Sequence, residues 1–155
     1  MNKILILGIG NLLMGDEGIG VHAVRYLVKN FQRSQVDLLD GGTGGFHLLE
    51  YFQKYPQIIM IDATMDGQAP GTIRLLKPKF SSDYPPTLTA HDIGLKDLLD
   101  ALFLLKQQPE IWLFTVSIAR LDRLSIELSP ELEKALPVLA EKISIRLNSI
   151  LTKKR

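Results

Sequence analysis

The chain has 155 residues, of which 46% are hydrophobic and 23% are charged, so it can bury a sizeable core and is not intrinsically disordered. Its 18 basic and 17 acidic side chains nearly cancel, which gives no argument for a nucleic-acid partner. The absence of cysteine excludes disulfides, thiolate metal ligands and a thiol nucleophile. We therefore expect a single domain spanning residues 1–155.

The N-terminus does not show the pattern of a signal peptide. Its apolar run, residues 3–7, is followed by Gly8 and Asn11, and no cleavage site of small residues comes after it. The chain contains no stretch of about 18 uninterrupted apolar residues, the length that a membrane-spanning helix needs. We expect a cytoplasmic protein that does not act at a membrane.

Apolar runs of strand length alternate with segments of helical periodicity, which is typical of a parallel sheet covered by helices. The expected strands are Lys3–Leu7, Val36–Leu39, Gln57–Ile61, Gly71–Lys77 and Ile111–Ser117. The expected helices are Gly20–Phe31, Phe46–Tyr55, Asp92–Lys106 and a last one that starts at Pro130, with Ser129 as N-cap. The pattern predicts an α/β fold of three layers: a mostly parallel, five-stranded sheet with helices on both faces.

Three local features refine this prediction. The strand at 71–77 follows a turn-rich connection that is too short for a crossover helix, so we expect an antiparallel edge strand. Pro137 is expected to kink or split the last helix. Residues 78–90 form a long irregular connection with three prolines, and such connections are often functional.

The first strand runs into a glycine-rich turn that ends in two carboxylates. Gly10 and Gly15 have the spacing of a phosphate-binding loop, but Asp16 and Glu17 stand where that loop has Lys and Ser or Thr. A phosphate would meet negative charge here, whereas a cation would be attracted. The turn is therefore more compatible with a metal than with a nucleotide.

Acidic residues follow two further predicted strands. Asp40 begins the turn Asp40-Gly41-Gly42-Thr43, and Asp62 ends the third strand. In open parallel sheets, ligands bind outside the carboxyl ends of the strands, so these acids and Glu17 are expected to converge. His91 ends the proline-containing connection and can reach the same rim. A Glu, an Asp and a His form a ligand set suited to zinc, nickel, iron or manganese.

Each acid of the first turn also has a purely structural interpretation. Asp16 can serve as the N-cap of the helix that begins near Gly18, and Glu17 can simply be favoured by the dipole of that helix.

The other candidates have structural alternatives too. Asp40 can form an Asx turn with the glycines after it, and Asp62 can be a satisfied polar residue at a strand end. His91 can be a surface residue that opens the following helix. His22 and His47 lie in helical segments and are interpreted as ordinary helix residues.

The ordered set of motifs resembles the endopeptidases that mature the large subunits of [NiFe]-hydrogenases. The resemblance spans nearly the whole chain and rests on these segments: Gly8-x-Gly10-Asn11-x-Leu13-x-x-Asp16-Glu17-Gly18-x-Gly20, Asp40-Gly41-Gly42-Thr43-x-Gly45, Ile61-Asp62-Ala63, His91-x-x-Gly94-Leu95-x-Asp97-x-Leu99 and Leu124-x-x-Glu127-Leu128-Ser129-Pro130. The chain departs from the family pattern at Ser117-Ile118-Ala119-Arg120, where the family tends to have Gly and Pro.

The resemblance implies a twisted five-stranded sheet and removal of a short C-terminal peptide from a nickel-loaded precursor. It maps the metal ligands onto Glu17, Asp62 and His91, and it matches Asp40 to an acid with a role in recognition or cleavage. The nickel is expected to arrive with the substrate, and zinc or cadmium could occupy the site in the isolated protein. We expect a monomer whose partner is the precursor.

Our hypothesis for the reaction is that a metal-activated water attacks the scissile bond, with Asp16 or Asp40 as general base. Two alternatives remain open. One is a self-sufficient zinc metallohydrolase, which the same ligands permit. The other is a non-enzymatic nucleotide- or partner-binding module, which is disfavoured because Leu13 replaces the third glycine of Gly-x-Gly-x-x-Gly.

Overall fold

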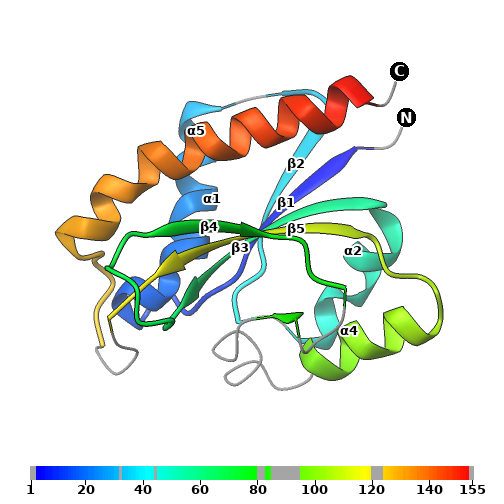
Figure 1. Ribbon diagram of the computed structural model, residues 1–155, viewed down its shortest axis with the longest axis horizontal. Coiled ribbons are helices and arrows are strands. Elements are labelled where there is room, and N and C mark those ends of the chain that lie inside the picture. Colours follow the sequence, from blue (N-terminus) through cyan, green and yellow to red (C-terminus); the bar gives the residue numbers. More distant parts are fainter. Residues whose placement is uncertain are drawn as a thin grey trace.

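The computed structural model describes residues 3–31, 33–43, 45–79, 83–84, 95–119 and 124–153. Within this part of the chain, a five-stranded sheet lies between two layers of helices, as Figure 1 shows. The predicted α/β fold with helices on both faces is confirmed.

The sheet has the strand order β2-β1-β3-β5-β4. Four strands are parallel to one another, and β4 pairs antiparallel with β5, as expected for the edge strand. The strands are β1 (Ile4–Gly8), β2 (Val36–Asp40), β3 (Gln57–Thr64), β4 (Ile73–Leu76) and β5 (Glu110–Ser117). The third strand is longer than predicted, because Asp62-Ala63-Thr64 continue to pair with β5.

The helices occur where the periodicity places them; the predicted start of the third one, Asp92, lies outside the described residues. The described helices are the 3-10 helix η1 (Gly15–Gly18), α1 (Ile19–Asn30), the 3-10 helix η2 (Phe46–Leu48), α2 (Leu49–Lys54), α4 (Leu95–Leu104) and α5 (Pro130–Lys153). None of the helices in the described ranges is long and apolar enough to cross a membrane.

The two faces of the sheet bury separate apolar clusters. Alternate residues of β3 point to opposite faces, as the pleat of a strand requires. Ile59 and Ile61 join the cluster of α1 and α5, whereas Ile58 and Met60 join the cluster of α2 and α4. Both faces of the central strands are therefore covered, which explains their nearly continuous apolar sequence.

Pro137 was expected to kink or split the last helix, and the structure excludes the split. Helix α5 runs without interruption from Pro130 to Lys153. Proline lacks the N–H that would bond back one turn, so one backbone hydrogen bond is missing. The helix nevertheless continues because it buries a long apolar stripe, formed by Leu132, Leu136, Leu139, Ile143, Leu147 and Ile150.

Candidate functional site

The carboxyl ends of β1, β2 and β3 lie next to one another. In the register of the sheet, Gly8 pairs with Asp40 on one side and with Ile61 on the other. Hydrogen bonds continue this contact beyond the strands: the Ile9 N–H donates to the Ile61 carbonyl at 2.9 Å, and the Gly10 N–H donates to the Gly42 carbonyl at 2.8 Å. The turns that follow these three strands therefore meet at one edge of the sheet.

Close backbone contacts bring η1 and α1 onto these strand ends. A Cβ atom on Gly20 would lie 2.2 Å from the Ile9 carbonyl oxygen and 2.4 Å from that of Ile61. Gly10 has φ +154°, and a Cβ there would lie 2.5 Å from the Glu17 carbonyl oxygen. These glycines allow the loop to fold back on itself and hold Glu17 close to the end of β3.

Glu17 is buried in this loop, with only 4% of its surface exposed. Its Oε2 accepts a hydrogen bond from the Asn11 backbone N–H at 2.8 Å, and the Asn11 side chain accepts one from the Leu13 N–H at 3.0 Å. A favourable interaction with the helix dipole does not require burial, whereas Glu17 is buried in the first turn of η1. Here the loop orients the carboxylate through the Asn11 backbone N–H. Sequence reasoning missed this role of Asn11, although an Asn is a usual sign of a tight turn.

Asp62 is also buried, with 1% of its surface exposed. Its Oδ1 accepts a hydrogen bond from the Ala63 N–H at 2.8 Å. Asp62 pairs with Thr115 in the register of the sheet, and two positions on Thr64 pairs with Ser117. All four residues are buried, so the carboxyl ends of β3 and β5 carry a polar row on the face of α2 and α4.

Asp40 is exposed at the end of β2, and its Oδ1 accepts a hydrogen bond from the Gly42 N–H at 2.9 Å. This contact forms the Asx turn that the structural alternative for Asp40 predicts. Gly42, at φ +57°, adopts the left-handed conformation that such a turn needs. The turn fixes one carboxylate oxygen, while the exposed side chain remains accessible from solvent.

Asp16 does not cap the helix that follows it. Neither η1 nor α1 has a side-chain hydrogen bond at its N-cap. Instead, Asp16 Oδ1 accepts a hydrogen bond from the Ser129 backbone N–H at 2.7 Å, immediately before α5. Ser129 was expected to cap α5 with its hydroxyl, but within the described chain that hydroxyl has no hydrogen-bond partner.

The segment before α5 pairs with the glycine-rich loop, a contact that sequence reasoning missed. Met14 and Ser125 form a parallel bridge, in which the Ser125 N–H donates to the Leu13 carbonyl at 2.8 Å. The Gly15 N–H donates to the Ser125 carbonyl at 2.6 Å. A pairing of so few residues produces no strand-length apolar run that could have indicated it.

His22 lies on α1 beside this pairing. Burial lowers the pKa of its imidazole below the ordinary value, and the positive charge of Arg25 lowers it further. The carboxylates of Glu133 and Asp16 and a hydrogen bond with the Ile126 backbone act in the opposite direction. His22 is half-buried on α1, whereas His47 is exposed on η2.

A cavity of about 400 Å³ lies where η1 meets the beginning of α5. Its lining includes the carboxylates of Asp16, Glu127 and Glu131, and no basic side chain is among its described lining residues. Met14 and Ser125, the two residues of the bridge, also line it. The acid-ended loop thus has two sides: Glu17 is buried against Asn11, and Asp16 borders this cavity.

His91, the third predicted metal ligand, lies outside the described residues, as does most of the connection 78–90. In the part of the chain that the structure does describe, no group of three or more His, Cys, Asp or Glu side chains has the arrangement of a metal site. Helix α4 begins four residues after His91 and packs, through Leu98 and Leu102, on the sheet face that carries Asp62. The ligand set Glu17, Asp62 and His91 stays a prediction.

Comparison with known proteins gives consistent results. A family profile described as hydrogenase maturation protease matches residues 21–145. The hydrogenase expression/formation protein HupM of Azotobacter chroococcum is 36% identical over 154 residues, which cover 90% of this chain and 73% of the relative. The solved structure of the hydrogenase maturating endopeptidase HybD from Escherichia coli aligns with a TM-score of 0.83 and 32% identity, covering 95% of this chain and 93% of that one.

Other relatives extend well beyond the region that matches this chain. The HupD protein of Rhizobium leguminosarum is 36% identical over 113 residues, which cover 70% of this chain but only 55% of the relative. The chain spans between 55% and 62% of the length of three HupD relatives that it matches. From the matched family profile and these identities, the chain belongs to the hydrogenase maturation protease family.

Proposed function

We propose that the protein is an endopeptidase that removes a short C-terminal peptide from the precursor of a [NiFe]-hydrogenase large subunit after nickel insertion. The observation that carries this proposal is the burial of Glu17 and Asp62 at the carboxyl edge of the sheet, in a chain of the hydrogenase maturation protease family. Similarity to HybD over nearly the full length of both chains supports it.

We assign Glu17, Asp62 and His91 to the recognition of the nickel that the precursor carries. Two carboxylates and an imidazole are donors that suit nickel, and zinc or cadmium could take the same donors in the isolated protein. The carboxylates fit this role because neighbouring strand ends carry them and backbone N–H groups orient them. The position of His91, shortly before a helix on the face of Asp62, supports its inclusion.

When bound there, the metal supplies Lewis-acid activation of the scissile carbonyl and of water. The protein's own residues then have to hold the peptide and accept a proton. We assign proton acceptance to Asp40 ahead of Asp16, because Asp40 is exposed at the carboxyl end of β2 whereas Asp16 accepts a hydrogen bond from the Ser129 N–H beside α5. On this scheme, the buried carboxylates select the metal-loaded precursor and place the scissile bond near Asp40.

We further propose that the enzyme works in the cytoplasm as a monomer, with the precursor as its partner and without nucleic acid or membrane. The balanced charge of the chain gives no support for nucleic acid, the absence of cysteine fits a reducing compartment, and an enzyme that docks one precursor has no need to self-associate.

The test is incubation of the purified protein with nickel-loaded and nickel-free precursor, followed by intact mass measurement of the precursor. We expect loss of a C-terminal peptide from the nickel-loaded form alone. Equal processing of both forms would refute the sensing of nickel, and no processing of either form would refute the proposed function.

The same assay tests the assigned residues. The variants Glu17→Gln, Asp62→Asn and His91→Ala should each process the loaded precursor much more slowly than wild type. If all three work at the wild-type rate, the assignment is wrong. Metal analysis of freshly purified protein addresses the rival scheme, since stoichiometric zinc would favour a self-sufficient zinc hydrolase.

A further inference from the structure

Three large apolar side chains project into solvent from the paired segments next to the site. Leu13 is 57% exposed, Leu124 79% and Ile126 63%. We call these three residues the apolar ladder. Isolated exposed leucines are ordinary on protein surfaces, but several on adjoining backbone segments indicate a contact surface.

The backbone that carries the apolar ladder is held in place. Hydrogen bonds from Ser125 to Leu13 and from Gly15 to Ser125 join the two segments. The bond from the Ser129 N–H to Asp16 fixes the same region beside α5. A surface that is already ordered loses little conformational entropy when a partner binds.

The apolar ladder is continuous with the proposed catalytic site. The Leu13 N–H donates to the Asn11 side chain, and the Asn11 N–H donates to the Glu17 carboxylate. One short stretch of loop therefore carries both an exposed apolar residue and the donor that orients a buried carboxylate. A protein bound on the apolar ladder would lie beside the strand ends where Glu17 and Asp62 are buried.

The charge beside the apolar ladder restricts what can bind there. The cavity of about 400 Å³ adjoins it through Met14 and Ser125, and its described lining carries the carboxylates of Asp16, Glu127 and Glu131. Glu127 and Glu131 are exposed to solvent. Such a surface is complementary to a segment that combines apolar side chains with a positive charge.

We infer that the apolar ladder is a docking surface for an apolar segment of the large-subunit precursor, and that the neighbouring cavity receives a basic side chain of that segment. This inference rests on the proposed function, because the proposed function supplies the precursor as the binding partner.

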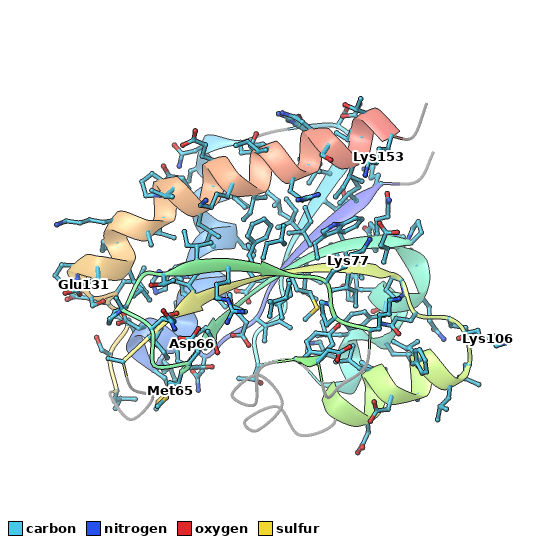
Figure 2. All side chains as sticks on the ribbon, viewed as in Figure 1. Met65, Asp66, Lys77, Lys106, Glu131 and Lys153 are labelled. Carbon is cyan, nitrogen blue, oxygen red and sulfur yellow. The ribbon has the colours of Figure 1, made fainter. Side chains whose placement is uncertain are left out.

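In Figure 2, Glu131 and the exposed Met65 lie at the same end of the molecule, and Lys106 lies at the opposite end.

The experiment compares two sets of variants in the cleavage of nickel-loaded precursor. The first is the triple variant Leu13→Ser, Leu124→Ser and Ile126→Ser. The matched control is Leu104→Ser, because Leu104 is 78% exposed near Lys106 at the end of α4. We expect the triple variant to raise KM about tenfold or more, to change kcat by less than about twofold, and the control to change neither.

The charge component is tested with the double variant Glu127→Gln and Glu131→Gln. We expect KM to rise by about threefold at low salt, with a smaller rise at high salt because salt screens exposed charges. Thermal unfolding of each variant shows whether it is folded. If the triple variant is not, the single variant Leu124→Ser decides, since its side chain is the most exposed of the three.

An active enzyme whose KM is unchanged in the triple variant and in Leu124→Ser would overturn the docking inference and leave the proposed function intact. A wild-type protein that cleaves no precursor would overturn both. A KM that rises equally in Leu104→Ser would also contradict the inference, because the effect would then not depend on the apolar ladder.

Discussion

The two ends of the sheet hold their carboxylates in different ways. At the carboxyl end, the three acids of the predicted site accept hydrogen bonds from backbone N–H groups: Glu17 from Asn11, Asp40 from Gly42 and Asp62 from Ala63. Asp66, which follows β3, also contacts Arg74 at 3.8 Å. At the amino end, carboxylates lie at the surface beside lysines. Lys3 contacts Asp37 at 3.3 Å, and Lys77 contacts Glu110 at 3.4 Å.

The backbone contacts orient the carboxylates, whereas the lysine contacts neutralise their charge. A backbone N–H is rigid and fixes the direction of a carboxylate without adding a full positive charge, so the group can still attract a cation. A lysine on a flexible side chain neutralises the carboxylate but hardly positions it, and exposed pairs stabilise a protein little. The carboxyl end is therefore suited to recognition, and the amino end to solubility.

The largest expected effect concerns the close contacts of the carboxyl end. Gly20→Ala places a Cβ against the carbonyl oxygens of Ile9 and Ile61, so we expect it to lower the free energy of unfolding by about 3 kcal/mol or more. Gly67→Ala is the control, since its φ is +80° but no atom lies within 4 Å of its Cβ, and it should cost about 1 kcal/mol. Urea unfolding measures both, and equal losses would contradict the packing argument.

The next effect concerns activity. Glu17→Gln keeps the shape of the side chain but removes its charge, so processing of the loaded precursor should fall by about a hundredfold or more. Asp37→Asn, at the amino end, should change the rate by less than about twofold. The comparison of the two ends fails if both variants lose the same activity.

A smaller effect tests whether Asp16 has a structural or a catalytic role. Asp16→Ala removes the acceptor of the Ser129 N–H and should cost about 1 kcal/mol of stability. Asp16→Asn retains an acceptor oxygen and should cost less, with processing within about tenfold of wild type. A hundredfold loss in Asp16→Asn, without a loss of stability, would instead identify Asp16 as the general base.

The pH dependence of stability offers a further test. Because the pKa of folded His22 lies below the unfolded value of 6.5, the unfolded chain binds more protons between the two values. The contribution of His22 to stability is therefore present above pH 6.5 and falls as the pH is lowered through that window. We expect His22→Gln to flatten the loss of stability between pH 7.5 and 5.5. Denaturant unfolding at several pH values measures the slopes.

The smallest effect is expected at the amino end. Lys3→Met removes one partner of a pair whose side chains are 51% and 36% exposed. The free energy of unfolding should change by about 0.5 kcal/mol or less, and even less at high salt. A change above 1 kcal/mol would show that surface pairs at this end matter more than the comparison allows.

The fold was predictable from the sequence because its signals are local. Apolar runs, helical periodicity and the turn before β4 each follow from neighbouring residues. The same is true of the Asx turn at Asp40, which needs only the glycines that follow. The uninterrupted α5 was not predictable, because Pro137 acts locally whereas the apolar stripe that stabilises the helix depends on the core cluster of α1 and α5.

The site was predictable only in part. The parallel sheet was predictable, so it could be expected that the turns carrying Glu17, Asp40 and Asp62 follow strands that end at the same edge. The partner of Asp16 could not, because Ser129 is 113 residues away in the chain and the contact depends on tertiary packing. The pairing of Met14 with Ser125 is equally long-range, and it creates the apolar ladder.

The edge strand β4 has a consequence for how the molecule behaves in a crowded solution. It is four residues long and antiparallel to its neighbour, it carries the charged Arg74, and Pro70 and Pro78 stand on either side of it in the chain. A second copy that tried to extend the sheet here would find few free backbone groups and would have to desolvate a guanidinium group. Such edges are typical protection against strand-to-strand aggregation, so the sheet can stay open on this side without recruiting further chains.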